Sequence, residues 1–330
     1  MKTGATSSNN PTPCVATIGF FDGVHLGHRY LIRQTQEVAA RRGVSTTVVT
    51  FRTHPRQVMQ PGFRPQLLTT GSEKEMLLKA TGIDRCLTME FTRELAQLTA
   101  RQFMERLRQE QGVEALVIGY DHRFGHGRSE GFDDYVRYGS ELGMEVSPAQ
   151  AYRLADGASI SSSRLRRLLQ EGDVEEAARE LGYAYFLSGT VVNGHRIGRT
   201  LGYPTANLQV TDPYKLIPAI GVYAVQVSHG REHYAGMLSI GHRPTVANGP
   251  ECSIEVHLLD FSGDLYGQTL TLTFVRRLRS EQRFDSLAQL ADQLRHDEAA
   301  TRACCADFHP IPIQKPTHSV LQRDHDDMCI

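Results

Sequence analysis

The chain has 330 residues, of which 40% are hydrophobic and 22% charged, and its net charge at pH 7 is −1. A chain of this length is typical of two domains, and either half is long enough to bury a core. The near-neutral charge gives no global field that would attract nucleic acid or an anionic membrane. Because neither a secretory signal nor a bilayer-spanning apolar run is visible, and the six scattered cysteines form no CxxC pair, we expect a cytoplasmic protein without structural zinc.

The first half of the chain alternates short apolar runs with amphipathic stretches. The runs predict strands at 14–20, 44–51, 84–89 and 115–119, and the stretches predict helices at 28–42 and 99–111. Such alternation favours a parallel sheet that is covered on both faces. Ligands of parallel sheets bind at the carboxyl ends of the strands, so the polar residues after Gly19, Thr50 and Gly119 are candidates for a site.

The pattern changes near Gly182, after two more helices predicted at 160–170 and 174–181. From residue 186 onward, apolar and polar residues alternate and turns are frequent, which favours a small antiparallel barrel or sandwich. Two hairpins are predicted, one from 221–227 and 234–240 and the other from 254–261 and 269–274. A helix at 285–303 follows, and the polar tail 304–330 is expected to be poorly ordered.

Residues 19–28, Gly-Phe-Phe-Asp-Gly-Val-His-Leu-Gly-His, link the first strand to the first helix. A helix start presents unpaired N–H groups to an anion, and Gly23 and Gly27 would let the backbone approach a phosphate chain. His25 and His28 can donate ring N–H bonds to phosphate oxygens. The same two histidines could instead bind a metal, or one could simply cap the helix.

Two further stretches are candidates for anion binding. Ser161 to Ser163 are N-cap candidates for a helix that carries Arg164, which would form a second anion clamp; without the first cluster, ordinary capping is the simpler interpretation. Asp121, at a strand end, could hold adenine or ribose, or cap a turn. Residues 194–207 form a glycine-rich loop with arginines, in which the Thr205 hydroxyl and the Asn207 carbonyl are oxygen donors suited to Mg²⁺. By itself a glycine-rich stretch is more often only a loop.

Glu255 stands on the strand face opposite Ile254 and Val256. A carboxylate beside bound phosphate could orient or deprotonate an attacking hydroxyl. Alternation alone, however, favours a glutamate that simply faces solvent.

The string GxFDGxHxGH at 19–28 resembles the FMN adenylyltransferase domain of prokaryotic bifunctional riboflavin kinase/FAD synthetases. Matching strings follow in the same order at 50–55, 119–125 and 160–166, although residues 127–131 are longer than the usual spacing. The resemblance implies a Rossmann-like nucleotidyltransferase domain with a parallel sheet at 14–182. It implies catalytic roles for His25, His28 and Arg164. It implies nucleotide or flavin binding by Gly19, Phe20, Asp22, Gly23, Gly27, His54, Asp121, Arg128 and Ser162.

The string Gly-Arg-x-x-Gly-x-Pro-Thr-Ala-Asn at 198–207 resembles the riboflavin kinase domain of the same family. This resemblance implies a small antiparallel β-barrel with a terminal helix at 183–303, and it makes Glu255 the catalytic base. Binding of Mg²⁺-ATP is implied for Gly198, Arg199, Pro204, Thr205 and Asn207, with Thr205 and Asn207 as metal ligands, and Arg279 is expected to shape the flavin pocket. The sequence departs from the family at Ser239, where asparagine is usual.

The sequence therefore predicts two enzymes in one α/β chain. The barrel would phosphorylate riboflavin to FMN with ATP and Mg²⁺, and the first domain would adenylylate FMN to FAD and release pyrophosphate. We expect riboflavin, FMN and ATP as partners, no nucleic acid or membrane, and a monomer or weak homo-oligomer. The alternatives are a single-activity relative, a flavin carrier or sensor without turnover, and a nucleotidyltransferase with another acceptor.

Overall fold

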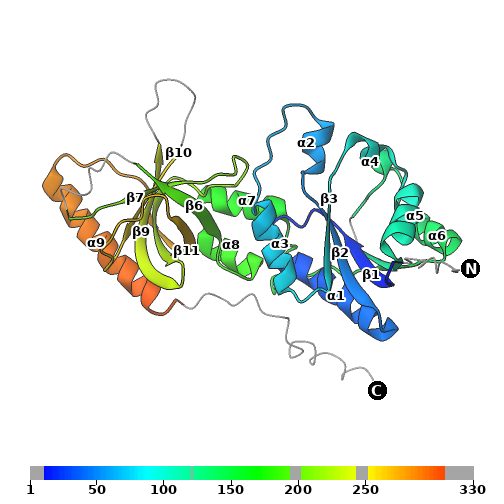
Figure 1. The fold of residues 1–330 in the computed structure, drawn as a ribbon. Helices are drawn as coiled ribbons and strands as arrows, with labels where there is room; N and C mark the ends of the chain where they lie inside the picture. Colours follow the sequence, from blue (N-terminus) through cyan, green and yellow to red (C-terminus); the bar gives the residue numbers. More distant parts are fainter. Residues whose placement is uncertain (1–10, 120–121, 194–201, 243–251, 309–330) are drawn as a thin grey trace, which may run out of the picture. The chain divides into compact units, whose positions relative to one another are not determined.

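The computed structural model describes residues 11–119, 122–193, 202–242 and 252–308 (Figure 1). The chain divides into two compact units. The described part of the first lies within Met1–Pro65 and Gly71–Ile160, and that of the second within Gln66–Thr70 and Ser161–Pro312. No helix in these described ranges is both long and apolar enough to cross a membrane.

The first unit contains a five-stranded parallel sheet in the order β3-β2-β1-β4-β5. Its strands are β1 (Cys14–Ile18), β2 (Ser45–Phe51), β3 (Arg85–Met89), β4 (Val113–Ile118) and β5 (Glu145–Pro148). The parallel sheet and four of these strands are as predicted. The edge strand β5 was missed because its four residues, Glu-Val-Ser-Pro, contain no apolar run.

Helices cover both faces of this sheet (Figure 1). They are α1 (Leu26–Arg42), α2 (Pro55–Met59), α3 (Gly71–Ala80), α4 (Arg93–Gln97), α5 (Ala100–Gln111), the short 3₁₀ helix η1 (His126–Arg128) and α6 (Phe132–Leu142). Alternate residues of β1 serve the two cores: Ala16 and Ile18 pack with α4, α5 and α6, whereas Val15 packs with α1. This period of two is what a strand buried on both faces requires.

Three helices of the first unit, α1, α5 and α6, end at a glycine in the left-handed region; Gly43 (φ 65°) after α1 and Gly112 (φ 71°) after α5 differ in their surroundings. At Gly43 a methyl group would meet nothing within 4 Å, but at Gly112 it would lie 2.5 Å from the carbonyl oxygen of Thr12. We expect Gly43→Ala to lose about 1 kcal/mol from the left-handed backbone alone, and Gly112→Ala to lose about 1–3 kcal/mol more through overpacking. Urea unfolding of the two variants measures the difference, and equal midpoints would contradict it.

The second unit is built around a closed barrel in the order β10-β7-β6-β11-β8-β9. Its strands are β6 (Phe186–Val192), β7 (Ala206–Gln209), β8 (Gly221–His229), β9 (Glu232–His242), β10 (Cys252–Leu258) and β11 (Thr269–Arg279). Every strand pair is antiparallel, and the pairing of β9 with β10 closes the sheet, so the barrel is confirmed and the sandwich is not. The first predicted hairpin turns at Gly230 and Arg231, where Gly230 (φ 60°) takes the first position of a two-residue loop.

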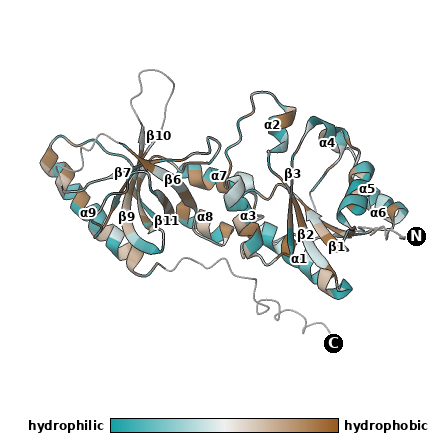
Figure 2. Cartoon of the chain, in the orientation of Figure 1, coloured by the Kyte–Doolittle hydropathy of each residue, from teal (hydrophilic) through white to brown (hydrophobic). Residues whose placement is uncertain are grey.

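The described residues of the second unit also form three helices: α7 (Ser162–Glu171), α8 (Val174–Leu181) and α9 (Leu287–Ala306). By contacts α7 and α8 therefore group with the barrel, although the sequence analysis assigned them to the first domain. The helix α9 begins after the N-cap Ser286 and extends through the first three residues of the expected tail. The barrel strands and α9 both mix apolar and polar residues along their length (Figure 2).

Candidate functional site: two phosphate-handling pockets

The first candidate site follows β1, at the centre of the parallel sheet. The neighbours β1 and β4 stand where the strand order reverses direction, and in open α/β sheets ligands bind outside the carboxyl ends of strands at such a point. The loop 19–25 leaves β1 there and leads into α1. The fold therefore places the predicted glycine- and histidine-bearing cluster where a parallel sheet of this order binds its ligand.

The loop after β1 has a strained backbone. Phe21 (φ 55°), Gly23 (φ 81°) and Val24 (φ 38°) all have positive φ angles, which is a genuine outlier for a β-branched valine. Phe21 and Val24 are both buried, and a methyl group on Gly19 would lie 2.9 Å from the ring of Phe21. Strain of this kind persists only where the surroundings over-determine it, and it clusters at functional sites.

His25 and His28 lie against each other at the start of α1. Their rings stack with centroids 3.6 Å apart, and His25 is the N-cap, whose Nδ1 accepts the backbone N–H of His28 at 3.3 Å. Since Nδ1 accepts, the proton of a neutral His25 is on Nε2. Gly27 makes room for this ring, because a methyl group there would lie 3.2 Å from two atoms of it.

The capping interpretation is therefore confirmed for His25, whereas phosphate binding by the two histidines stays a prediction. The third alternative is a metal site. Within the described ranges, no three or more His, Cys, Asp or Glu side chains are grouped so that they could hold a metal ion.

Burial and neighbouring positive groups keep His28 neutral. Loss of water contact lowers its pKa well below the usual value, and His25, Lys74 and His122 add repulsion in that order. Its Nδ1 is buried and finds no hydrogen-bond partner among the described residues. A buried polar atom without a partner is uncommon in a folded protein and calls for an explanation.

The other predicted residues of this site occupy several positions around the loop. Asp22 is buried. His54 caps the start of α2, and its ring packs edge-on against Phe20 at a centroid distance of 4.7 Å. Asp121 and the side chain of Arg128 lie outside the described residues.

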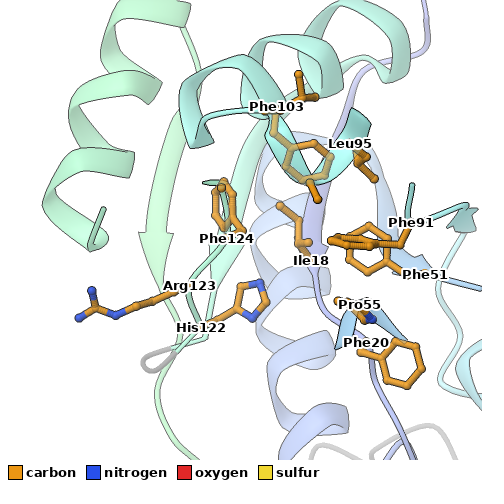
Figure 3. A pocket seen from close by; sticks show the side chains of 13 residues that line it. Ile18, Phe20, Phe51, Pro55, Phe91, Leu95, Phe103, His122, Arg123 and Phe124 are labelled. Carbon is orange, nitrogen blue, oxygen red and sulfur yellow. The ribbon is translucent and has the colours of Figure 1, made fainter. Parts of the chain in front are cut away.

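An aromatic cavity of about 130 Å³ opens beside the same strand ends. Phe51, Phe91, Phe103 and Phe124 gather around it, with Ile18 between them and His122 on one side, while Arg123 points away (Figure 3). Phe20 lines it as well, so the loop and the cavity share a residue. Apolar, aromatic walls with a few polar groups at the rim are typical of small-molecule sites. Of these aromatic residues, Phe20, Phe51 and Phe124 fall within the strings at 19–28, 50–55 and 119–125, whereas Phe91 and Phe103 lie outside any such string.

Ser162 and Arg164 lie on α7, in the second unit. Ser161 is the N-cap, as predicted, and its hydroxyl accepts the backbone N–H of Arg164 at 3.2 Å. The guanidinium of Arg164 donates at 2.5 Å to Glu180, a carboxylate that is fully buried on α8. Glu180 was not anticipated, because a glutamate in a polar helix predicts a solvent-facing side chain.

The second candidate site lies on the barrel, where β7 and β10 pair. Asn207 and Glu255 are direct partners in this ladder, and Ser239 faces Glu255 from the other side, on β9. The Thr205 hydroxyl donates to Oε2 of Glu255 at 3.2 Å. Residues 254, 256 and 258 are buried and Glu255 is not, so the predicted division of strand faces is confirmed. The geometry brings Thr205, Asn207 and Glu255 into one oxygen-rich group.

His257 and Tyr203 hold the segment before β7. Nδ1 of His257 donates to the carbonyl oxygen of Pro204 at 2.7 Å, and the ring of Tyr203 packs edge-on against His257. The Tyr203 hydroxyl donates to Glu298 on α9 at 3.0 Å. This segment is therefore fixed to both the barrel wall and the terminal helix, whereas Gly198 and Arg199 lie outside the described residues.

A cavity of about 360 Å³ adjoins the oxygen-rich group and is lined by Thr205, Glu255, His257 and Arg279 among others. Its volume is within the range of about 300–1,000 Å³ that is common for ligand pockets. Arg279 makes a two-pronged ion pair with the buried Asp297 of α9, with an Nη2–Oδ2 distance of 2.8 Å. The sequence predicted Arg279 as a residue of the flavin pocket but gave no sign of Asp297. An aspartate on an amphipathic helix is expected to be exposed to solvent.

The chain thus has two candidate ligand sites. One is the loop 19–25 at the point where the strand order of the parallel sheet reverses, and the other is the oxygen-rich group on the closed barrel. This arrangement defines a class of protein with two candidate nucleotide sites. Family models agree: the FAD synthetase model matches residues 7–164, and the riboflavin kinase model matches residues 181–305. The chain belongs to the family of bifunctional riboflavin kinase/FMN adenylyltransferases.

Curated relatives from several bacteria carry that name. The protein from Pseudomonas fluorescens is 40% identical, over 89% of this chain and 93% of the relative. The protein from Escherichia coli K12 is 38% identical, over 88% of this chain and 92% of the relative. Among solved structures, a Streptococcus pneumoniae chain titled a macrolide-efflux protein has 34% identity and a TM-score of 0.82, over 88% of this chain and 94% of that one.

Proposed function

We propose that the chain makes FAD from riboflavin in two steps, each of which consumes one ATP. The observation that carries this proposal is the presence, in one chain, of two chemically different sites: Thr205, Asn207 and Glu255 on the barrel, and His25 and His28 at the end of β1. The match to both family models over consecutive parts of the chain supports the same division.

The barrel carries the kinase step in this proposal. Glu255 takes the proton of the terminal ribityl hydroxyl, whose oxygen then attacks the γ-phosphorus of ATP, and the bond to the ADP oxygen breaks. The contact between Thr205 and Glu255 holds the base beside the phosphates. The flavin occupies the cavity lined by Arg279, and Gly198, Arg199 and Pro204 cover the triphosphate.

The residues present suit Mg²⁺ as the partner of ATP. Thr205 and Asn207 supply neutral oxygen donors of the kind that this hard cation accepts, and phosphate oxygens and water complete its shell. When bound, the metal neutralises charge on the phosphates. The chain's own residues hold the base, orient the hydroxyl and exclude water.

The parallel-sheet unit carries the adenylyl transfer. The phosphate of FMN is already a nucleophile, so its oxygen attacks the α-phosphorus of ATP directly and pyrophosphate leaves without a covalent enzyme intermediate. The protein then contributes positioning and charge stabilisation. We assign His25 and His28 to the phosphates at the helix start and the aromatic cavity to the flavin ring. Ser162 and Arg164, on α7 of the second unit, stay sequence-based candidates for binding the pyrophosphate.

Incubation of the purified protein with riboflavin, ATP and Mg²⁺, followed by chromatography of the flavins over time, tests the proposal. We expect FMN first and FAD afterwards, with one ATP consumed in each step. FAD formed only from supplied FMN would indicate a single-activity relative, and a bound but unchanged flavin would indicate a carrier.

We further propose that the enzyme works in the cytoplasm as a monomer or weak homo-oligomer.

A further inference from the structure

Lys74 on α3 is a buried lysine that no sequence pattern singled out. Its side chain is only 4% exposed, and its ammonium group donates to the carbonyl oxygen of Phe51 at 2.7 Å and to that of Phe20 at 3.1 Å. The ammonium nitrogen also lies 3.9 Å from the centroid of the Phe20 ring. Burial of a lysine is costly unless its charge is compensated, so its position calls for a reason.

The two carbonyl groups that accept hydrogen bonds from Lys74 belong to the aromatic cavity and to the loop 19–25. Phe51 is the last residue of β2 and forms a wall of the aromatic cavity. Phe20 immediately precedes the strained stretch from Phe21 to Val24, and its carbonyl oxygen accepts a second bond from the Thr50 hydroxyl at 3.1 Å. Lys74 therefore connects the ends of β1 and β2 at the start of the loop 19–25, which we call the anion-binding loop.

We propose that Lys74 is a positioning residue for adenylyl transfer, whose buried ammonium group holds the anion-binding loop and the aromatic wall in their reactive arrangement. This inference rests on the proposed adenylyl-transfer activity of the first unit. A strained loop needs anchors that over-determine its backbone, and a misplacement of about 1 Å in such a site can reduce the rate about 10²-fold. Two charge-assisted hydrogen bonds are stronger anchors than neutral ones.

The charge of Lys74 also acts on its neighbours. Burial lowers its pKa to about 8, while Asp22 and Cys86 partly offset that effect. In turn Lys74, together with His25 and His122, lowers the pKa of His28. Above pH 8 the ammonium group loses its proton, and both of its hydrogen bonds to carbonyl groups lose their charge assistance. We therefore expect a fall in adenylyl transfer above pH 8 that the kinase step of the same chain does not share.

The test compares Lys74→Met with Lys79→Met, a matched change at an exposed lysine on the same helix that pairs with Glu75. For Lys74→Met, the kcat for conversion of supplied FMN to FAD should fall about 10²-fold, and the further fall in this rate above pH 8 should disappear. Phosphorylation of riboflavin by Lys74→Met should stay at the wild-type rate. Lys79→Met should convert FMN to FAD at the wild-type rate. The pKa of His28, followed by NMR, should rise in Lys74→Met because a positive neighbour is lost. Lys74→Arg, which keeps its charge above pH 8, should recover part of the rate without the alkaline limb.

Three results would overturn the inference. One is an adenylyl-transfer rate in Lys74→Met within threefold of wild type. Another is an equal loss of both activities together with a lowered melting temperature, which would indicate a purely structural lysine. The third is an unchanged pKa of His28. If wild-type protein forms no FAD at all, the proposed function fails instead, so the two failures are distinguishable.

Discussion

Replacement of Glu255 by glutamine is expected to stop the conversion of riboflavin to FMN while FMN supplied from outside is still converted to FAD. Glutamine keeps the shape of the side chain and can still accept the hydrogen bond from Thr205, but it cannot take a proton. Loss of a general base typically reduces a rate by about 10²–10⁴-fold. The measurement is the initial rate of FMN formation, with adenylylation of supplied FMN recorded on the same protein.

A matched control for Glu255→Gln is Glu232→Gln, because Glu232 is an exposed carboxylate on the neighbouring strand β9 that accepts a hydrogen bond from the nearby Tyr234 hydroxyl. Both changes remove one negative charge from the barrel, so a general electrostatic effect would appear in both variants. If the two variants phosphorylate riboflavin equally well, Glu255 is not the base. If Glu255→Gln loses both activities while it remains folded, the proposed division between the two units is wrong.

The regular parts of this fold were predictable because their signals are local. The buried strands β1, β2 and β4 read as apolar runs, and the barrel strand β10 alternates residue by residue in the sequence as it does in the structure. The helix α3 and the edge strand β5 gave weaker signals, since the apolar run of α3 is only three residues long, Met76 to Leu78, and β5 has none. Contact between distant segments, which groups α7 with the barrel, leaves no local trace.

The candidate sites were only partly predictable, for a different reason. The glycines and histidines of 19–28 form a specific string, but the positive φ angle of Val24 opposes the ordinary preference of valine. Lys74, Glu180 and Asp297 are charged residues on helices, and a charged helical residue predicts exposure. Each is buried against a partner from another segment. Lys74 donates to two carbonyl groups near the strand ends, Glu180 pairs with Arg164, and Asp297 pairs with Arg279. Such partners become visible only in three dimensions.

Replacement of His28 by alanine is expected to have the opposite effect to the change at Glu255: FMN accumulates and FAD does not form. The ring of His28 is held by its stacking on His25 and by edge-on packing against Phe21, with centroids 5.2 Å apart, so its position is set before any ligand arrives. Removal of one preorganised donor from a site of charge development typically costs about 10²–10³-fold in rate. Chromatography of the flavins formed from riboflavin measures both steps at once.

The control for His28→Ala is His126→Ala in η1, an exposed histidine of the same unit. His28→Gln adds a second comparison, because its amide can donate a hydrogen bond but cannot gain a proton. If a donor is all that the reaction needs, His28→Gln should recover part of the rate lost in His28→Ala, in keeping with the lowered pKa that keeps the wild-type ring neutral. If glutamine recovers nothing although the protein binds ATP normally, a charged imidazole takes part in the reaction. FAD formation by His28→Ala at the wild-type rate would remove His28 from the site altogether.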